Sequence, residues 1–87
     1  MTMTMQVRLR FFASLREALG ADATLELPDA CTVGQARDLL IARGEPFAGA
    51  LARGRAVRAA LNQALCDESA GLKGGDELAF FPPVTGG

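Results

Sequence analysis

The sequence predicts an α+β fold, in which one main helix packs across one face of a mixed sheet of four or five strands. Three observations lead to this prediction. Apolar residues alternate with polar ones in several short segments, as they do in half-buried strands. One segment near the middle of the chain has apolar residues at helical spacing. The chain has 87 residues, enough for a single hydrophobic core but too few for a catalytic domain beside a separate binding domain.

Two strands are expected in the first third of the chain. The first covers residues 5–12, and the second covers residues 23–27 and ends at Pro28, because proline cannot donate to a strand ladder. The residues expected to point into the core are Val7, Leu9, Phe11, Leu25 and Leu27.

Two helices are expected around the second strand. A short one over 14–20 opens on a Ser-x-x-Glu capping box and ends at a glycine. The main helix over 32–43 opens on a second capping box, formed by Thr32 and Gln35, and stops at Gly44.

The second half of the chain is less regular. Residues 45–55 predict either a helical turn or a packed loop. The alternation over 57–61, followed by Asn-Gln and by 64–66, predicts one long bent strand or a short hairpin. The last apolar strand is expected over 78–81, where it meets two prolines.

This order of elements favours a β-grasp roll as the simplest way to bury the apolar faces. The expected organisation is an N-terminal extension without order over 1–4, a domain over 5–81, and an extended tail over 82–87.

Charge and composition exclude several classes of function. Nine basic and ten acidic residues give a net charge of -1, so the chain has no broad positive field for nucleic acid. The chain has no histidine, which removes the commonest general base and the commonest metal ligand. No export signal, membrane span, metal site or bound cofactor is expected, and two widely spaced cysteines indicate a reducing cytoplasm.

The remaining polar groups do not form a recognisable catalytic set, so an enzyme acting alone is not expected. Cys31 precedes a helix and is a candidate nucleophile, although a buried thiol is the simpler interpretation for it. The pairs at 67–68 and 76–77 are expected to be solvated turns. Three arginines are close together in the sequence, and we expect them on a solvated face or in contact with an acidic partner or a phosphate. They are Arg53, Arg55 and Arg58.

The end of the chain is its most unusual feature. After the last strand come Pro82, Pro83, Val84, Thr85, Gly86 and Gly87, without a charged side chain among them. Two prolines favour an extended exit, and six extended residues span about 20 Å. Because glycine has no Cβ, the last two residues fit a channel too narrow for other residues. The sequence therefore predicts a terminus that delivers the Gly87 carboxylate into the active site of a partner.

The run from Gly75 to Gly87 closely resembles the C-terminus of the small, sulfur-carrying subunits of molybdopterin synthase. A looser likeness extends back through Asn62 and Gln63 to Phe11 and Phe12. The resemblance implies a ubiquitin-like β-grasp fold, which agrees with the roll expected from periodicity.

The resemblance also implies a function. An E1-like adenylating enzyme would use ATP to activate Gly87, and a sulfur donor would convert the acyl-adenylate to a thiocarboxylate. The tail, with Pro83, Val84, Thr85 and Gly86, would then enter the large synthase subunit, where sulfur passes to cyclic pyranopterin monophosphate to build the dithiolene of the molybdenum cofactor.

Phe12 and Phe81 are the expected docking residues. Alternation places Phe80 in the core and Phe81 outward, beside Phe12 if the first and last strands are neighbours. The alternative is that the segment 45–58 covers one of the two rings.

Two other functions remain open at this point. One is a sulfur carrier for a different thiolation pathway, such as that of thiamine or tRNA. The other is a ubiquitin-like protein modifier or a plain interaction module.

Overall fold

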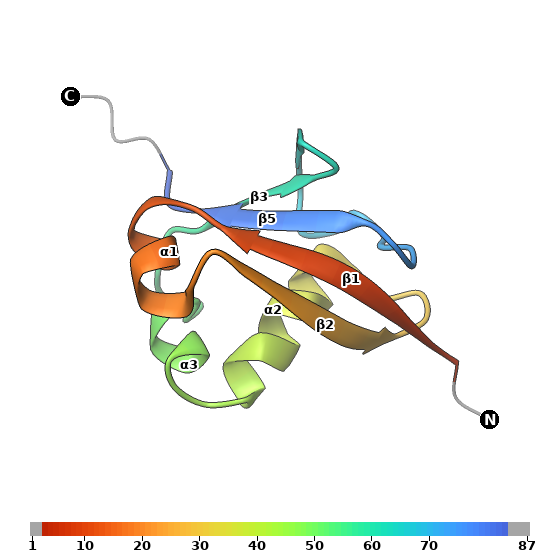
Figure 1. Cartoon of the computed structure of the whole chain (residues 1–87), viewed down its shortest axis with the longest axis horizontal. Coiled ribbons are helices and arrows are strands. Elements are labelled where there is room, and N and C mark those ends of the chain that lie inside the picture. The colour runs from red at the N-terminus through yellow and green to blue at the C-terminus, as the bar shows by residue number, and fades with distance from the viewer. Residues whose placement is uncertain (1–2, 84–87) are drawn as a thin grey trace.

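The computed structural model describes residues 3–83, and the predicted α+β roll is confirmed. Five strands and three helices make up this part of the chain, with α1, α2 and α3 on one side of the sheet (Figure 1). In chain order the elements are β1 (Thr4–Phe11), α1 (Ala13–Leu19), β2 (Asp22–Pro28), α2 (Val33–Ala42), α3 (Phe47–Ala50), β3 (Arg58–Leu61), β4 (Ala64–Cys66) and β5 (Glu77–Phe81).

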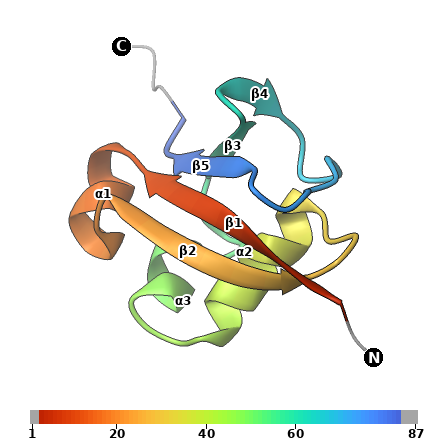
Figure 2. The same cartoon turned by 45° about the vertical axis from the view of Figure 1, so that its right-hand side comes forward.

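The sheet is mixed and its strand order is β2-β1-β5-β3-β4. The first and last strands, β1 and β5, lie side by side in its centre and run parallel, while the other neighbours are antiparallel (Figure 2). Parallel neighbours need a long crossover, which here contains all three helices. The central place of β5 means that the chain leaves the sheet beside β1 and β3 rather than at an outer edge.

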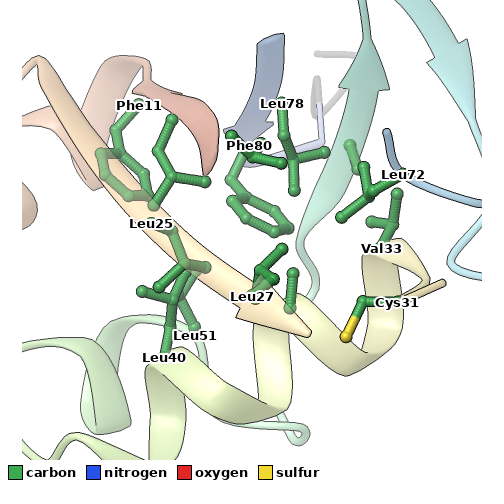
Figure 3. Close-up of a cluster of buried hydrophobic side chains, with 14 of the residues drawn as sticks. Phe11, Leu25, Leu27, Cys31, Val33, Leu40, Leu51, Leu72, Leu78 and Phe80 are labelled. Atoms are coloured by element: carbon green, nitrogen blue, oxygen red, sulfur yellow. The ribbon is translucent and has the colours of Figure 1, made fainter. Parts of the chain in front are cut away.

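One core lies between the sheet and α2. The rings of Phe11 and Phe80 stack with centroids 6.3 Å apart, and Leu40 of α2 packs below the sheet (Figure 3). The inward residues expected from alternation are confirmed: Val7, Leu9, Phe11, Leu25, Leu27 and Phe80 are all at most 1% exposed. Burial of these apolar side chains is the main stabilising contribution to the fold.

The first strand begins at Thr4, one residue earlier than expected. Thr4 pairs with Pro28, and the N–H of Asp29 donates to the carbonyl of Met3. Backbone pairing with β2 therefore reaches into the segment that was expected to be an extension, while residues 1 and 2 of that segment lie outside the described residues.

The predicted start of α1 is wrong, whereas that of α2 is confirmed. Ser14 lies inside the first turn of α1, whose N-cap is Phe12 and receives no side-chain hydrogen bond. At α2, the Thr32 side chain accepts from the N–H of Gln35, and the Gln35 side chain accepts from the N–H of Thr32. The difference arises because the pairing of β1 with β5 continues to the N–H of Phe12, so the turn into α1 is set by the sheet.

The segment after α2 contains a helical turn, α3, and not only a loop. Leu51 follows this turn and is fully buried, and the Phe47 ring lies 6.3 Å from that of Phe11. The segment therefore closes the end of the core near α1.

Of the two alternatives for residues 57–66, the hairpin is correct. Asn62 and Gln63 connect β3 to β4 with φ values of 51° and 70°, the left-handed conformation that a two-residue type I′ turn requires. Asn62 also fixes the turn to β5, because its side chain donates to Asp76 and accepts from the N–H of Glu77. Asp76 in turn accepts from the N–H of Lys73, so the pair at 76–77 is not simply a solvated turn.

Replacing Gln63 by glycine is expected to raise the free energy of unfolding. A left-handed conformation costs a non-glycine residue about 1–2 kcal/mol, and glycine avoids that strain while losing part of the gain to its greater freedom in the unfolded chain. We expect Gln63→Gly to stabilise by roughly 0.5–1 kcal/mol, measured by urea unfolding. Asn62→Gly is the matched control, since it relieves similar strain but loses the bonds to Asp76 and Glu77. A lower unfolding midpoint for Gln63→Gly would contradict the expectation.

Candidate functional site

The expected tail leaves the sheet from its centre. Its first two residues, Pro82 and Pro83, are half-buried and directly follow β5. The other predicted tail residues, Val84, Thr85, Gly86 and Gly87, lie outside the described residues. The described part of the chain therefore places the root of the tail, but not the reactive group itself.

The two phenylalanines expected to dock a partner lie at this root. The N–H of Phe12 donates to the carbonyl of Phe80 at 3.2 Å, which puts Phe12 next to Phe81 along the pairing of β1 with β5. The Phe12 side chain is 39% exposed, and Phe81 is half-buried. The condition for placing Phe81 beside Phe12, that the first and last strands are neighbours, is thus met.

Sequence reasoning missed three residues of the same surface. Strand pairing places Leu65 of β4 opposite Ala60 of β3, and Ala60 opposite Ala79 of β5. Residues directly opposite each other in a sheet share a face, so all three lie on the outer face with Phe81. Leu65 is 72% exposed, the most exposed large apolar residue of the described chain. We call the set Phe12, Ala60, Leu65, Ala79 and Phe81 the outer apolar patch.

Arg10 borders this patch. Its guanidinium lies 5.3 Å from the centroid of the Phe12 ring, within the range of a cation–π interaction. The same group faces Asp22 at 3.6 Å and Glu77 at 4.0 Å. Such exposed pairs contribute little to stability, but together these contacts fix the position of the Arg10 side chain beside Phe12.

The most buried arginine of the described chain is not among the three that the sequence singled out. Arg37 of α2 is 4% exposed. Its Nε donates to the carbonyl of Leu51 at 2.8 Å, and its Nη2 donates to the carbonyls of Ala52 and Arg55 at 2.8 and 3.2 Å. Its Nη1 pairs with Glu68 at 2.8 Å. Arg37 therefore ties the irregular segment after α3 to the main helix.

Glu68 and Arg53 form ion pairs within the chain that their sequence context does not predict. Glu68, expected in a solvated turn, accepts from both Arg37 and Arg53. Arg53, expected on a solvated face or against an acidic partner or a phosphate, is exposed, and it also pairs with Asp38 at 2.8 Å and donates to the carbonyl of Gly34 at 3.0 Å. The network is internal to the chain, so the Arg53 guanidinium is already paired with carboxylates of the same chain.

Removing the charge of Glu68 is expected to reduce the loss of stability in acid. Hydrogen bonds from Arg53, and secondarily from Arg37, hold the pKa of the Glu68 carboxyl below its ordinary value. A lowered folded-state pKa stabilises the fold above the unfolded value of about 4.3, and this contribution is lost as the pH falls through the folded-state pKa. We expect Glu68→Gln to melt earlier than the wild type at pH 7 and to show a smaller further decrease below pH 4.

The control for this experiment is Glu17→Gln. Glu17 is exposed on α1 and forms no ion pair within residues 3–83. Melting curves of the three proteins between pH 7 and pH 3 compare the two carboxylates directly. Equal acid sensitivity of the wild type and Glu68→Gln would show that the network does not stabilise the folded state through the charge of Glu68.

The cysteines do not supply a nucleophile to this surface. Cys31 is 7% exposed and packs in the core, as its simpler interpretation predicts. Burial, with a further contribution from Asp67, raises the pKa of the Cys66 thiol, so little of it is thiolate at neutral pH. Over residues 3–83 no cluster of cysteine and carboxylate side chains could hold a metal ion. None of the described helices combines the length and the apolar character that crossing a membrane requires.

Comparison with known proteins places this arrangement in a family. A model described as the ThiS family matches residues 9–87. The molybdopterin synthase sulfur carrier subunits of Escherichia coli strain K12 and Haemophilus influenzae are each 44% identical to the chain, over 93% and 88% of its length and 99% and 94% of theirs.

Solved structures of related proteins have a similar fold. Small archaeal modifier protein 1 of Haloferax volcanii is 26% identical, with a TM-score of 0.74 over 92% of this chain and 99% of its own. A complex of subunits 1 and 2 of the molybdopterin-converting factor from Helicobacter pylori contains a chain that is 28% identical, with a TM-score of 0.65 over 95% of this chain and 100% of its own. With a family model covering nearly the whole sequence and close relatives of matching length, the chain belongs to the ThiS family, as a ubiquitin-like β-grasp protein related to molybdopterin synthase sulfur carrier subunits.

Proposed function

We propose that this chain is the sulfur carrier subunit of a molybdopterin synthase. The observation that carries the proposal is the 44% identity to two molybdopterin synthase sulfur carrier subunits over most of each chain. The geometry supports it, because the central strand β5 leads directly into the two prolines at the root of the Gly-Gly tail, and an exposed apolar surface adjoins that root.

The proposed chemistry takes place on the Gly87 carboxylate. A carboxylate resists nucleophiles, so an E1-like enzyme first joins it to the α-phosphate of ATP and releases pyrophosphate. A persulfide sulfur of a donor protein then attacks the acyl carbon of this adenylate and expels AMP. A thiol cleaves the resulting acyl disulfide, which releases the thiocarboxylate and leaves the donor in a disulfide with that thiol. The thiocarboxylate sulfur attacks cyclic pyranopterin monophosphate in the large subunit, and hydrolysis returns the carboxylate. Two such rounds supply the two sulfurs of the dithiolene.

In these steps the chain delivers the reactive terminus, and its partners provide the catalytic groups. It has no histidine, and burial keeps the Cys66 thiol mostly protonated. Six extended residues from Pro82 to Gly87 reach about 20 Å, so the folded domain remains outside while the terminus enters a closed active site. Exclusion of water from that site protects the thiocarboxylate from hydrolysis.

The intact mass of the chain tests the proposal. We would incubate it with an E1-like adenylating enzyme, ATP and a sulfur donor, and expect a mass increase equal to the replacement of one oxygen by sulfur. The Escherichia coli carrier subunit serves as a positive control, and a reaction without ATP serves as a negative one. An unchanged mass when the control protein is converted would contradict a carrier function in any pathway.

Binding to the large synthase subunit decides the pathway. The thiocarboxylated chain is expected to co-elute with that subunit and to convert cyclic pyranopterin monophosphate to molybdopterin. A chain that acquires sulfur but neither binds the large subunit nor forms molybdopterin would instead belong to another thiolation pathway, such as that of thiamine or tRNA.

A second candidate function is protein modification, which the likeness to small archaeal modifier protein 1 favours. In that case a lysine amine of a target, rather than sulfur, displaces AMP from the adenylate and forms an isopeptide bond with Gly87. Mass spectrometry of tryptic peptides distinguishes the two, since modification leaves the remnant of residues 74–87 on target lysines, because the last tryptic site of the chain follows Lys73, and a sulfur carrier leaves none.

A further inference from the structure

The outer face of the sheet carries charged side chains of both signs. The outer face of the sheet is not covered by the described helices, which all lie on the other side (Figures 1 and 2). Strand pairing places Arg8, Arg10 and Arg58 on this face together with the carboxylates of Asp22, Glu26 and Glu77. The carboxylates lie on the edge strand β2 and at the start of β5, whereas Arg58 lies opposite Phe81 at the end of β5.

Arg58 is the arginine of this face that lies closest to the root of the tail. It is exposed, and β3–β5 pairing puts it directly opposite Phe81, which precedes the two prolines. It therefore borders both the outer apolar patch and the segment that leaves the fold.

The charge of Arg58 has no partner within residues 3–83. Arg10 is compensated by Asp22 and Glu77, whereas Arg58 forms no ion pair in this part of the chain. Arg58 also lines a hollow of about 370 Å³ together with Asp67 and Glu68. Glu68 is already paired with two other arginines, and Asp67 is not within ion-pair distance of the Arg58 guanidinium.

We propose that Arg58 forms a salt bridge with a carboxylate at the rim of the large synthase subunit, and that this contact selects a partner with an acidic rim. The inference rests on the proposed function, because the partner is the subunit that receives the tail. An apolar centre with a charged rim is the usual anatomy of a protein interface, and arginine is enriched there. Complementary charge at such a rim increases the association rate and disfavours partners of the wrong sign.

Charge reversal at Arg58 tests the proposal. We would measure binding of the carrier to the large subunit by titration calorimetry at low and high salt. Arg58→Glu is expected to weaken binding at low salt at least about tenfold, because it sets like charges against each other. Arg58→Lys should bind nearly as the wild type does, and Arg58→Met should fall between them. The wild-type affinity should decrease with salt, and that of Arg58→Glu should decrease less.

Arg43→Glu is the matched control. Arg43 is exposed at the C-terminal end of α2, on the helical side of the sheet, and the substitution changes the net charge by the same amount. It should leave the affinity for the large subunit unchanged. Melting curves of all variants confirm that each is folded.

Several results would overturn the proposal. Equal weakening by Arg58→Glu and Arg43→Glu would mean that net charge, not position, matters. Tighter binding of Arg58→Met would mean that the partner offers an apolar contact at this position. If Arg58→Glu bound the adenylating enzyme more weakly but bound the large subunit as the wild type does, Arg58 would contact the adenylating enzyme instead. If the wild type itself failed to bind the large subunit, the proposed function would be contradicted. That result differs from the ones above, in which the wild type binds and only the variants change.

Discussion

Deleting Gly87 is expected to abolish sulfur transfer while leaving the melting temperature unchanged. The shortened chain ends in the carboxylate of Gly86, which lies about 3.5 Å short of the position that the full-length terminus reaches. Misplacement of a reacting group by as little as 1 Å can reduce a rate about 100-fold, so we expect a decrease of at least that size in both adenylation and molybdopterin formation.

Stability should not change, because the buried core of the described chain ends at Phe80. The measurements are the rate of pyrophosphate release with the adenylating enzyme, the yield of molybdopterin, and thermal unfolding by circular dichroism. A chain extended by one residue beyond Gly87 is the matched control for length, and we expect it to be equally inactive. A shortened chain that still transfers sulfur would show that the terminal carboxylate is not the carrier group, and a large decrease in melting temperature would show that the tail is part of the fold.

Replacing Arg37 by alanine is expected to have the largest effect on stability. The substitution leaves the carbonyls of Leu51, Ala52 and Arg55 without this donor and removes one partner of Glu68. Each buried acceptor left without a donor costs about 1–3 kcal/mol, and the sum is a large part of the roughly 5–15 kcal/mol that stabilises a typical domain. For a chain of this size we expect the melting temperature to fall by roughly 15 °C or more.

Arg53→Ala provides the comparison for this experiment. Arg53 contacts the same carboxylate, but its side chain is 47% exposed, and exposed ion pairs contribute at most about 1 kcal/mol. Urea unfolding of the two variants separates the contribution of burial from that of charge. Similar midpoints for Arg37→Ala and the wild type would show that the segment 51–55 holds its place without the guanidinium.

The parts of the fold that follow from local spacing were predictable. The alternation in β1 identifies Val7 and Leu9 as inward residues, since successive side chains of a strand point to opposite faces. The capping box at Thr32 marks the start of α2, because both of its hydrogen bonds form within one turn. Alternation in β5 also separates the buried Phe80 from the outward Phe81.

Local patterns failed where a distant segment decides the outcome. Ser14 and Glu17 have the spacing of a capping box, but pairing of Phe12 with Phe80 starts α1 before that box. Arg37 lies on the buried face of α2 with Val33 and Leu40, and its guanidinium is satisfied by carbonyls 14 to 18 residues away. Neither contact has a counterpart in the spacing of neighbouring residues.

The candidate site also has features that could be predicted from the sequence and features that could not. The Gly-Gly tail and the outward position of Phe81 could be inferred from the sequence, because they depend on residue type and on alternation within one strand. The place of Leu65 and Arg58 on the same surface could not, because it depends on the register of β3 with β4 and β5. An exposed leucine in a three-residue strand carries no signal of its own.

The sequence alone determined the approximate extents of β1, β2, α2 and β5 and which side chains of those strands point inward, and it predicts the terminal glycine as the reactive group. These properties depend on spacing within a few residues. The tertiary structure decided the order of the strands, the partners of Arg37, and the composition of the surface around the root of the tail. Those properties depend on contacts between segments that are far apart in the chain, and such contacts are selected by the packing of the whole core rather than by any local pattern.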